Sequence, residues 1–251
     1  MFPLIRGWTD VNRTTRTNVR LGAVLALVAG AANAGGFLAV GQYTSHMTGV
    51  VSSVADNLAL GKGTLVVTGI GSYLAFVLGA MTTAILVNWG LRRQLRSAYG
   101  IPLLLEAILL LVFGLFGAVM NVMTALLVPI TVILLCFMMG LQNAVISKIS
   151  NAEIRTTHVT GLTTDLGIEL GKLLYVNRND KRPPVLANRG RLRLHALLIA
   201  CFFTGSVLGA LGFRSFGYVT TVPLALMLLL LVARPVLDDL RRRRQEDDSC
   251  R

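Results

Sequence analysis

Two short polar segments contain most of the side chains that could bind a ligand in this otherwise apolar chain. Residues 44–49 read TSHMTG and residues 156–161 read TTHVTG, and we call them the first and second hexads. Each carries hydroxyls, a glycine and a histidine, the side chain that titrates near neutral pH. Hydroxyl, imidazole and free backbone N–H groups at a helix start are donors suited to a polar or anionic solute. The hexads therefore predict a pair of solute-binding motifs.

Two other interpretations of the hexads compete with binding. In membranes, Thr, Ser and Gly let helices pack closely, and the hydroxyls then bond to neighbouring backbones. A membrane-embedded enzyme would use the His, Thr and Asp groups for catalysis, but the pattern H-x-T-G fits no metal-ligand or nucleophile motif. We therefore expect no catalytic residue, no metal and no cofactor, and we keep solute binding and helix packing as alternatives.

Further polar residues flank the hexads at matching positions. Asn33 precedes the first hexad and the pair Gln142-Asn143 precedes the second, while one aspartate follows each hexad. The predicted solute-binding set is Asn33, Thr44, Ser45, His46, Thr48, Gly49, Asp56, Gln142, Asn143, Thr156, Thr157, His158, Thr160, Gly161 and Asp165.

Glu106 is the candidate for proton coupling. It lies about one and a half turns into an apolar run, and an ionisable group inside a membrane is costly unless it has a function or a partner. The alternative is that Glu106 pairs with Arg93 or Arg96 near the cytoplasmic end of that run.

The apolar residues are collected into runs that indicate a membrane protein. The chain is 54% hydrophobic over 251 residues, and about 20 apolar residues cross a bilayer as a helix. The first run ends in an A-x-A sequence typical of a signal-peptide cleavage site, but Asn33-Ala34 there recurs as Asn143-Ala144, so we expect a retained helix. Six spans are predicted, at 20–41, 64–88, 101–120, 124–146, 194–213 and 216–233.

The basic residues predict the orientation. With the N-terminus in the cytoplasm, 22 of the 24 Lys and Arg fall in cytoplasmic segments and only Lys62 and Arg214 fall outside, as the positive-inside rule requires. This distribution explains the net charge of +12 without nucleic acid as a partner, and it favours contact with anionic lipids. The three cysteines show no paired spacing and predict no disulfide.

The sequence also contains an internal repeat. The hexads, Asn-Ala and the LGK at 60–62 recur 110 to 112 residues later, and AFVLGA at 75–80 recurs as GSVLGA after a basic insertion. Three spans per half is an odd number, so the second copy is inverted, as in many transporters. The expected organisation is a basic N-terminal segment 1–20, repeats at 21–120 and 121–233, and a basic tail 234–251, with short re-entrant or interfacial helices at 44–62 and 156–172 and a cytoplasmic loop at 175–193.

The segments NAGGFLAVGQYTSHMTG and MGLQNAVISK…RTTHVTG resemble the YoaK-like family of bacterial multi-pass membrane proteins, from about residue 21 to 232. The resemblance implies the bacterial inner membrane and a family without an assigned activity. The chain has Asn33 where family members often have Asp, and Val50 where they often have Asn.

The sequence favours a transporter or channel for a small, unidentified solute, with a path between the two repeats. A structural or assembly subunit that packs through glycine-rich faces is the third class, after the membrane enzyme. The sequence leaves both the solute and a homo-oligomeric state open.

Overall fold

The structure is a computed structural model that describes residues 8–11, 13–119, 124–178 and 183–249. Within these ranges the chain is helical or irregular, with no β-strand. The elements in chain order are α1 (Thr15–Val40), α2 (Met47–Ala59), α3 (Gly63–Arg92), α4 (Gly100–Val119), α5 (Thr124–Ser150), α6 (Val159–Leu174), α7 (Arg189–Phe216), the 3₁₀ helix η2 (Gly217–Thr220) and α8 (Thr221–Ser249).

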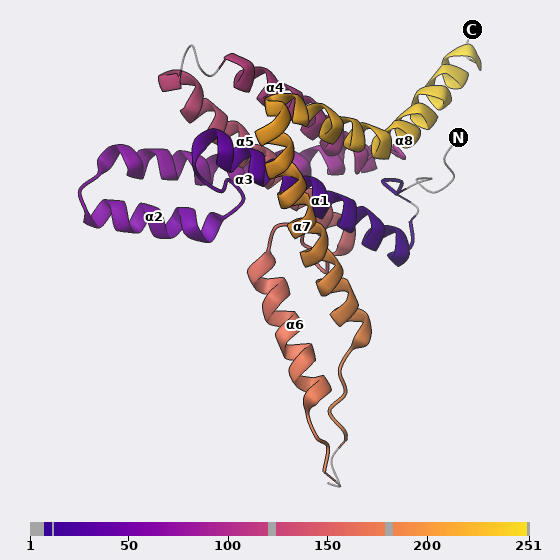
Figure 1. Cartoon of the computed structure of the whole chain (residues 1–251). Helices are drawn as coiled ribbons and strands as arrows, with labels where there is room; N and C mark the ends of the chain where they lie inside the picture. The colour runs from indigo at the N-terminus through magenta and orange to yellow at the C-terminus, as the bar shows by residue number, and fades with distance from the viewer. Residues whose placement is uncertain (1–7, 12, 120–123, 179–182, 250–251) are drawn as a thin grey trace.

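The helices long and apolar enough to cross a membrane coincide with the predicted runs. Four are α1, α3, residues 100–117 of α4 and residues 127–150 of α5. A fifth continuous stretch, Arg189–Arg242, covers α7, η2 and α8 as far as Arg242, and it contains the last two predicted spans. Gly217 has a φ of 61° at the end of α7, and the chain changes direction between α7 and α8 (Figure 1).

The two short motif helices form, with boundaries shifted from those predicted. The segment predicted at 44–62 contains α2, and the segment predicted at 156–172 contains the start of α6. Gly61 has a φ of 68° just after α2 and allows a tight turn into α3. The expected helix end at Gly171-Lys172 is wrong, because α6 continues to Leu174. The predicted border between the repeats, 120/121, lies outside the described residues.

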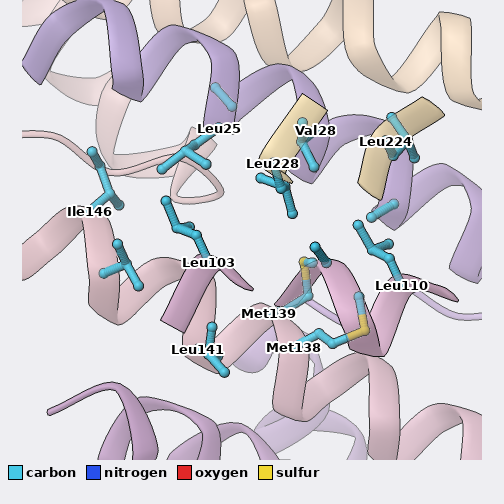
Figure 2. Packing of buried hydrophobic residues seen from close by; sticks show 14 of the residues in the cluster. Leu25, Val28, Leu103, Leu110, Met138, Met139, Leu141, Ile146, Leu224 and Leu228 are labelled. Carbon is cyan, nitrogen blue, oxygen red and sulfur yellow. The ribbon is translucent and has the colours of Figure 1, made fainter. Parts of the chain in front are cut away.

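The main core lies among α1, α4, α5 and α8. Leu25 of α1, Leu103 of α4, Met138 of α5 and Leu228 of α8 are each completely buried, and Figure 2 shows these helices contributing side chains to one cluster. Large apolar side chains at helical spacing therefore hold the centre of the molecule together.

Helix α3 has a different surface. Its buried residues are a single stripe of mostly small side chains, such as Ala75, Gly79 and Thr83. Its large apolar side chains point outward, with Val67 at 72% and Ile85 at 65% exposure. An outward-facing apolar surface of this extent suits contact with lipid.

The helix contacts of the first half reappear in the second half. Helix α1 packs against α7, and the corresponding α5 packs against α3, while α2 packs on α3 and α6 packs on α7. The backbones approach closely at both crossings: a Cβ at Gly30 would overlap the carbonyl oxygen of Phe202, and a Cβ at Gly140 would overlap that of Phe76. Glycine is required at both positions because only hydrogen fits there.

Contacts also bring four distant segments to one face of the molecule. Arg13, just before α1, stacks on the ring of Tyr99 with 4.1 Å to the centroid and donates to the Ile149 carbonyl at the end of α5. Asp239 of α8 accepts hydrogen bonds from the Ser97 amide at 2.9 Å and hydroxyl at 2.6 Å. The start of α1, the α3–α4 turn, the end of α5 and the second half of α8 around Asp239 therefore lie together.

Candidate functional site

The hexads follow equivalent helices and are buried in the same order. The first follows the end of α1, where Gly41 adopts a left-handed φ of 73°, and the second follows α5. In each, the first threonine (Thr44 or Thr156) is buried, the next residue is half-buried and the histidine is exposed. The hydroxyls of Thr44 and Thr156 have no hydrogen-bond partner within the described residues.

Each hexad is tied to the preceding helix by the same type of hydrogen bond. The Ser45 hydroxyl donates to the side-chain oxygen of Asn33 at 3.0 Å, and the Thr157 hydroxyl donates to that of Asn143 at 2.8 Å. Asn33 is only 7% exposed. These bonds fix how the chain leaves α1 and α5, and they occupy both amide oxygens.

The histidines stand at the first residue before each short helix. His46 precedes α2 and His158 precedes α6, with similar backbone angles and no side-chain cap. The hydroxyls of Ser45 and Thr157 do not cap these helices, because they bond back to the asparagines instead. Each imidazole lies over the glycine three residues later, where a Cβ at Gly49 or Gly161 would overlap the ring.

Arg155 defines the hydrogen-bonding state of one histidine. Its guanidinium lies 3.2 Å from Nδ1 of His158. Because arginine can only donate, Nδ1 is the acceptor and the neutral ring carries its proton on Nε2. His158 can therefore act as a donor to a ligand.

Both hexads line one cavity of about 1100 Å³. Sixteen of its 21 lining residues form eight pairs at equivalent positions of the two repeats. Five pairs are alike in chemistry, namely Asn33/Asn143, Ser45/Thr157, His46/His158, Met47/Val159 and Thr48/Thr160. Three pairs differ, namely Phe37/Ser147, Tyr43/Arg155 and Phe76/Ser206. None of the described residues lining the cavity is an aspartate or glutamate.

A second cavity of about 380 Å³ adjoins the first hexad. It lies among the end of α1, α2 and α3, and it includes Gly49 and Ser72 in its wall. Phe37, Tyr43 and His46 line both cavities. These three side chains therefore form the partition between them.

The structure places the predicted site residues in four groups. Asn33, Ser45, His46, Thr48, Asn143, Thr157, His158 and Thr160 line the large cavity. Thr44, Thr156 and Gln142 are buried behind its wall, and Gln142 donates from Nε2 to the Leu25 carbonyl at 3.1 Å. Gly49 and Gly161 lie under the imidazoles. Asp56 and Asp165 are exposed on α2 and α6 and line neither cavity.

Glu106 is completely buried, and both of its carboxylate oxygens are without a hydrogen-bond partner within the described residues. The alternative of an ion pair with Arg93 or Arg96 is wrong: Arg93 stacks on Trp89 at 5.0 Å and Arg96 lies 3.8 Å from Asp238. In the part of the chain that is described, no three His, Cys, Asp or Glu side chains are placed to share a metal ion.

A family model described as "Protein of unknown function (DUF1275)" matches residues 21–233. The chain belongs to this family. It is also similar to the UPF0700 transmembrane protein YoaK of Bacillus subtilis (strain 168), with 28% identity over 212 residues that cover 82% of this chain and 88% of the relative. No solved structure matches the chain. The resemblance to YoaK-like proteins is confirmed, and together with the apolar helices it shows a membrane protein.

Several cavity residues of this DUF1275 chain were not predicted. Phe37, Tyr43, Phe76 and Arg155 line the cavity beside the hexads. Tyr43 and Arg155 directly precede the hexads at equivalent positions, so the repeat alignment could have identified them. A repeat is recognised from residues that are alike, and these pairs do not stand out because they differ in chemistry.

Proposed function

We propose that this protein is an inner-membrane transporter or channel for a small solute, and that the solute passes through the large cavity. Six spans, α1, α3, α4, α5, α7 and α8, cross the bilayer, and the short helices α2 and α6 carry the hexads. The observation that carries the proposal is that both hexads line one cavity of about 1100 Å³, a volume slightly above the usual range of about 300–1,000 Å³ for small-molecule sites.

The paired contacts support an inverted repeat. Exchange of the halves converts the α1–α7 crossing into the α5–α3 crossing, and it converts the Ser45–Asn33 bond into the Thr157–Asn143 bond. The eight residue pairs around the cavity support a repeat axis that passes through it. Transporters commonly place their substrate sites at such a repeat interface.

Charge and contacts together support cytoplasmic termini. The starts of α1 and α4, the end of α5 and the second half of α8 lie on one face. This face carries Arg13, Arg92 and Arg93, and the basic tail begins there. An excess of Lys and Arg marks the cytoplasmic side. The tail arginines would then contact anionic lipid headgroups.

The positions along the helices indicate a path across the membrane. Asn33 lies about 27 Å along α1 from its start on the basic face, whereas Asn143 lies about 10 Å before the end of α5 on that face. The cavity touches both asparagines, so it reaches α1 and α5 at different distances from their ends on the basic face. A cavity that polar side chains of both hexads line favours transport over a purely structural subunit. The paired, similar hexads also differ from the asymmetric groups of a catalytic site.

Cysteine accessibility in inside-out and right-side-out vesicles tests the path. On a background with Cys136, Cys201 and Cys250 replaced by serine, we expect Thr48→Cys and Thr160→Cys to react with a membrane-impermeant thiol reagent and to block solute entry into proteoliposomes. Thr44→Cys, at a buried position, is the matched control and should not react. If the cysteines at both hexads do not react, water does not reach the interface between the repeats and the proposed solute path is rejected.

A further inference from the structure

The three pairs that differ in chemistry give the cavity an apolar end and a cationic end. At the first hexad, Phe37 and Tyr43 line the wall with their rings stacked, 4.7 Å between centroids. At the equivalent positions by the second hexad stand Ser147 and Arg155. The two halves therefore share most of their polar cavity residues. They differ where the first half has the aromatic pair Phe37 and Tyr43 and the second half has Ser147 and Arg155.

The two asparagine oxygens of the cavity are already engaged as acceptors, and the group beside Arg155 is a donor. The side-chain oxygens of Asn33 and Asn143 already accept from Ser45 and Thr157. The Nε2–H of His158 is a donor because Arg155 occupies Nδ1. Since the described wall contains no carboxylate, a cation entering it would meet donors and positive charge.

The short helices add to this electrostatic preference. Helices α2 and α6 begin at Met47 and Val159 without a side-chain cap, and Thr48 and Thr160 in their first turns line the cavity. A helix start carries a partial positive charge and unpaired N–H groups. The start of α6 therefore reinforces Arg155 and His158, and the start of α2 adds a partial positive charge at His46.

We propose that the solute is a small organic anion with an apolar, preferably aromatic, body, whose anionic group binds at Arg155 and His158 and whose body contacts Phe37 and Tyr43. This assignment rests on the proposed transport function and names its solute class. With the second hexad on the cytoplasmic side, the anionic group is oriented toward the cytoplasm. Arg155 would bind it by a charge-assisted hydrogen bond.

Titration calorimetry on the purified full-length protein tests the charge preference. The anionic probes are benzenesulfonate, phenylphosphonate and benzoate, and the cation of similar size is benzyltrimethylammonium. We expect at least one anion to bind and the cation not to bind. Binding of the cation as tight as that of the best anion, or binding of none of the anions, would overturn the assignment.

Two substitutions at exposed positions separate the two ends of the site. Arg155→Gln should weaken benzenesulfonate and methanesulfonate binding alike, by about tenfold or more, since each loses the same charged contact. Tyr43→Ala should weaken benzenesulfonate alone, because methanesulfonate has no ring. Arg92→Gln, an exposed arginine outside the cavity, is the control. An Arg155→Gln protein with unchanged affinity for all the anions would contradict the proposed anion site.

Flux measurements keep this proposal distinct from the transport function. Benzenesulfonate and benzyltrimethylammonium are permanently charged, so neither crosses protein-free liposomes readily. If an anion binds but no probe crosses the membrane, the anion site is supported and the transport function is rejected. Flux of the cation at the rate of the anion would leave transport in place and reject anion selectivity.

Discussion

The ring of Phe37 stacks on the ring of Tyr43 with an interplanar angle of 17°, and both residues belong to the wall shared by the two cavities. This pair, together with His46, separates the large cavity from the smaller one between α2 and α3. Stacked aromatic rings are held by dispersion and electrostatic attraction of about 0.5–1.5 kcal/mol. Such a weak contact suits a partition that opens and closes.

The first prediction is that removing one ring opens the partition. Phe37→Ala should raise the leak of benzenesulfonate from preloaded proteoliposomes without unfolding the protein, because the ring is 41% exposed. Phe203→Ala, at an outward position that is 68% exposed, removes a ring from the α7 surface and should leave the leak unchanged. Equal leak from both variants would exclude a gating role for Phe37.

The second prediction concerns the bonds that hold the hexads. Ser45→Ala and Thr157→Val each remove one neutral hydrogen bond to an asparagine, so each should lower the free energy of unfolding by about 0.5–1.5 kcal/mol. Thr163→Val, at an exposed position of α6, should have no such effect. A double-mutant cycle of Ser45→Ala with Asn33→Ala measures the coupling directly, and a coupling near zero would show that the bond contributes nothing.

Much of the fold could be predicted from the sequence because apolar runs and repeated sequence motifs are local signals. The helices formed where the runs were, and the two hexads were recognised because their letters match. Their convergence on one cavity depends on the crossings of α1 with α7 and α3 with α5. The pattern of glycines at 30 and 140 is compatible with those crossings but does not specify the partners.

Side-chain direction accounts for several arrangements that the sequence does not reveal. The Ser45 hydroxyl points back to Asn33 and not toward the start of α2. The sequence suggests Arg93 or Arg96 as an ion-pair partner for Glu106. Glu106 instead lies on the helix face of Leu103 and Leu110, which faces the core. Asp56 follows its hexad closely, yet it lies on the exposed face of α2.

The third prediction tests the close helix crossings. Gly30→Ala and Gly140→Ala should each destabilise the protein, by about 1–3 kcal/mol as overpacking does, because a Cβ overlaps a backbone carbonyl of the facing helix. Gly167 in α6 has open space around it, so Gly167→Ala should be neutral or stabilising by up to about 1 kcal/mol. Chemical unfolding in detergent measures all three. If Gly30→Ala matches Gly167→Ala, the crossing of α1 and α7 is looser than described.

The fourth prediction concerns pH and the connection between α6 and α7. Glu169 contacts Lys172 at 2.8 Å and accepts from the Asn188 amide at 2.6 Å. The hydrogen bond from Lys172, then that from Asn188, hold the pKa of Glu169 below its usual value. A lowered pKa in the folded state means that this contact stabilises the fold above the unfolded-state pKa of about 4.3 and is lost as the pH falls through the folded-state pKa.

Hydrogen exchange of the Asn188 amide measures this loss. Protection, corrected for the intrinsic rate, should be present at pH 6 and should fall as Glu169 is protonated. Glu169→Gln should lack that acid-dependent change, whereas Asp165→Asn, at an exposed carboxylate on the same helix, should retain it. A change of equal size in the Glu169→Gln protein would mean that another group causes it.

The last prediction concerns Glu106, whose carboxylate oxygens are both buried without a partner in the described part of the chain. Burying an ionised carboxylate without a partner is very costly, so selection for stability alone would favour an apolar side chain at this core position. We therefore expect Glu106 to bind and release a proton during transport. Glu106→Gln keeps the shape of the side chain and removes the titrating group.

In proteoliposomes with an imposed pH gradient, wild-type protein should accumulate benzenesulfonate, while Glu106→Gln should only equilibrate it. The thermal stability of the variant should be equal to or above that of wild type, because a neutral amide replaces an acid in the core. Ser72→Ala, which removes a buried polar group on α3 instead of a titratable one, should still accumulate the anion. If Glu106→Gln accumulates benzenesulfonate as wild type does, Glu106 carries no coupling proton, and its burial has a purely structural origin.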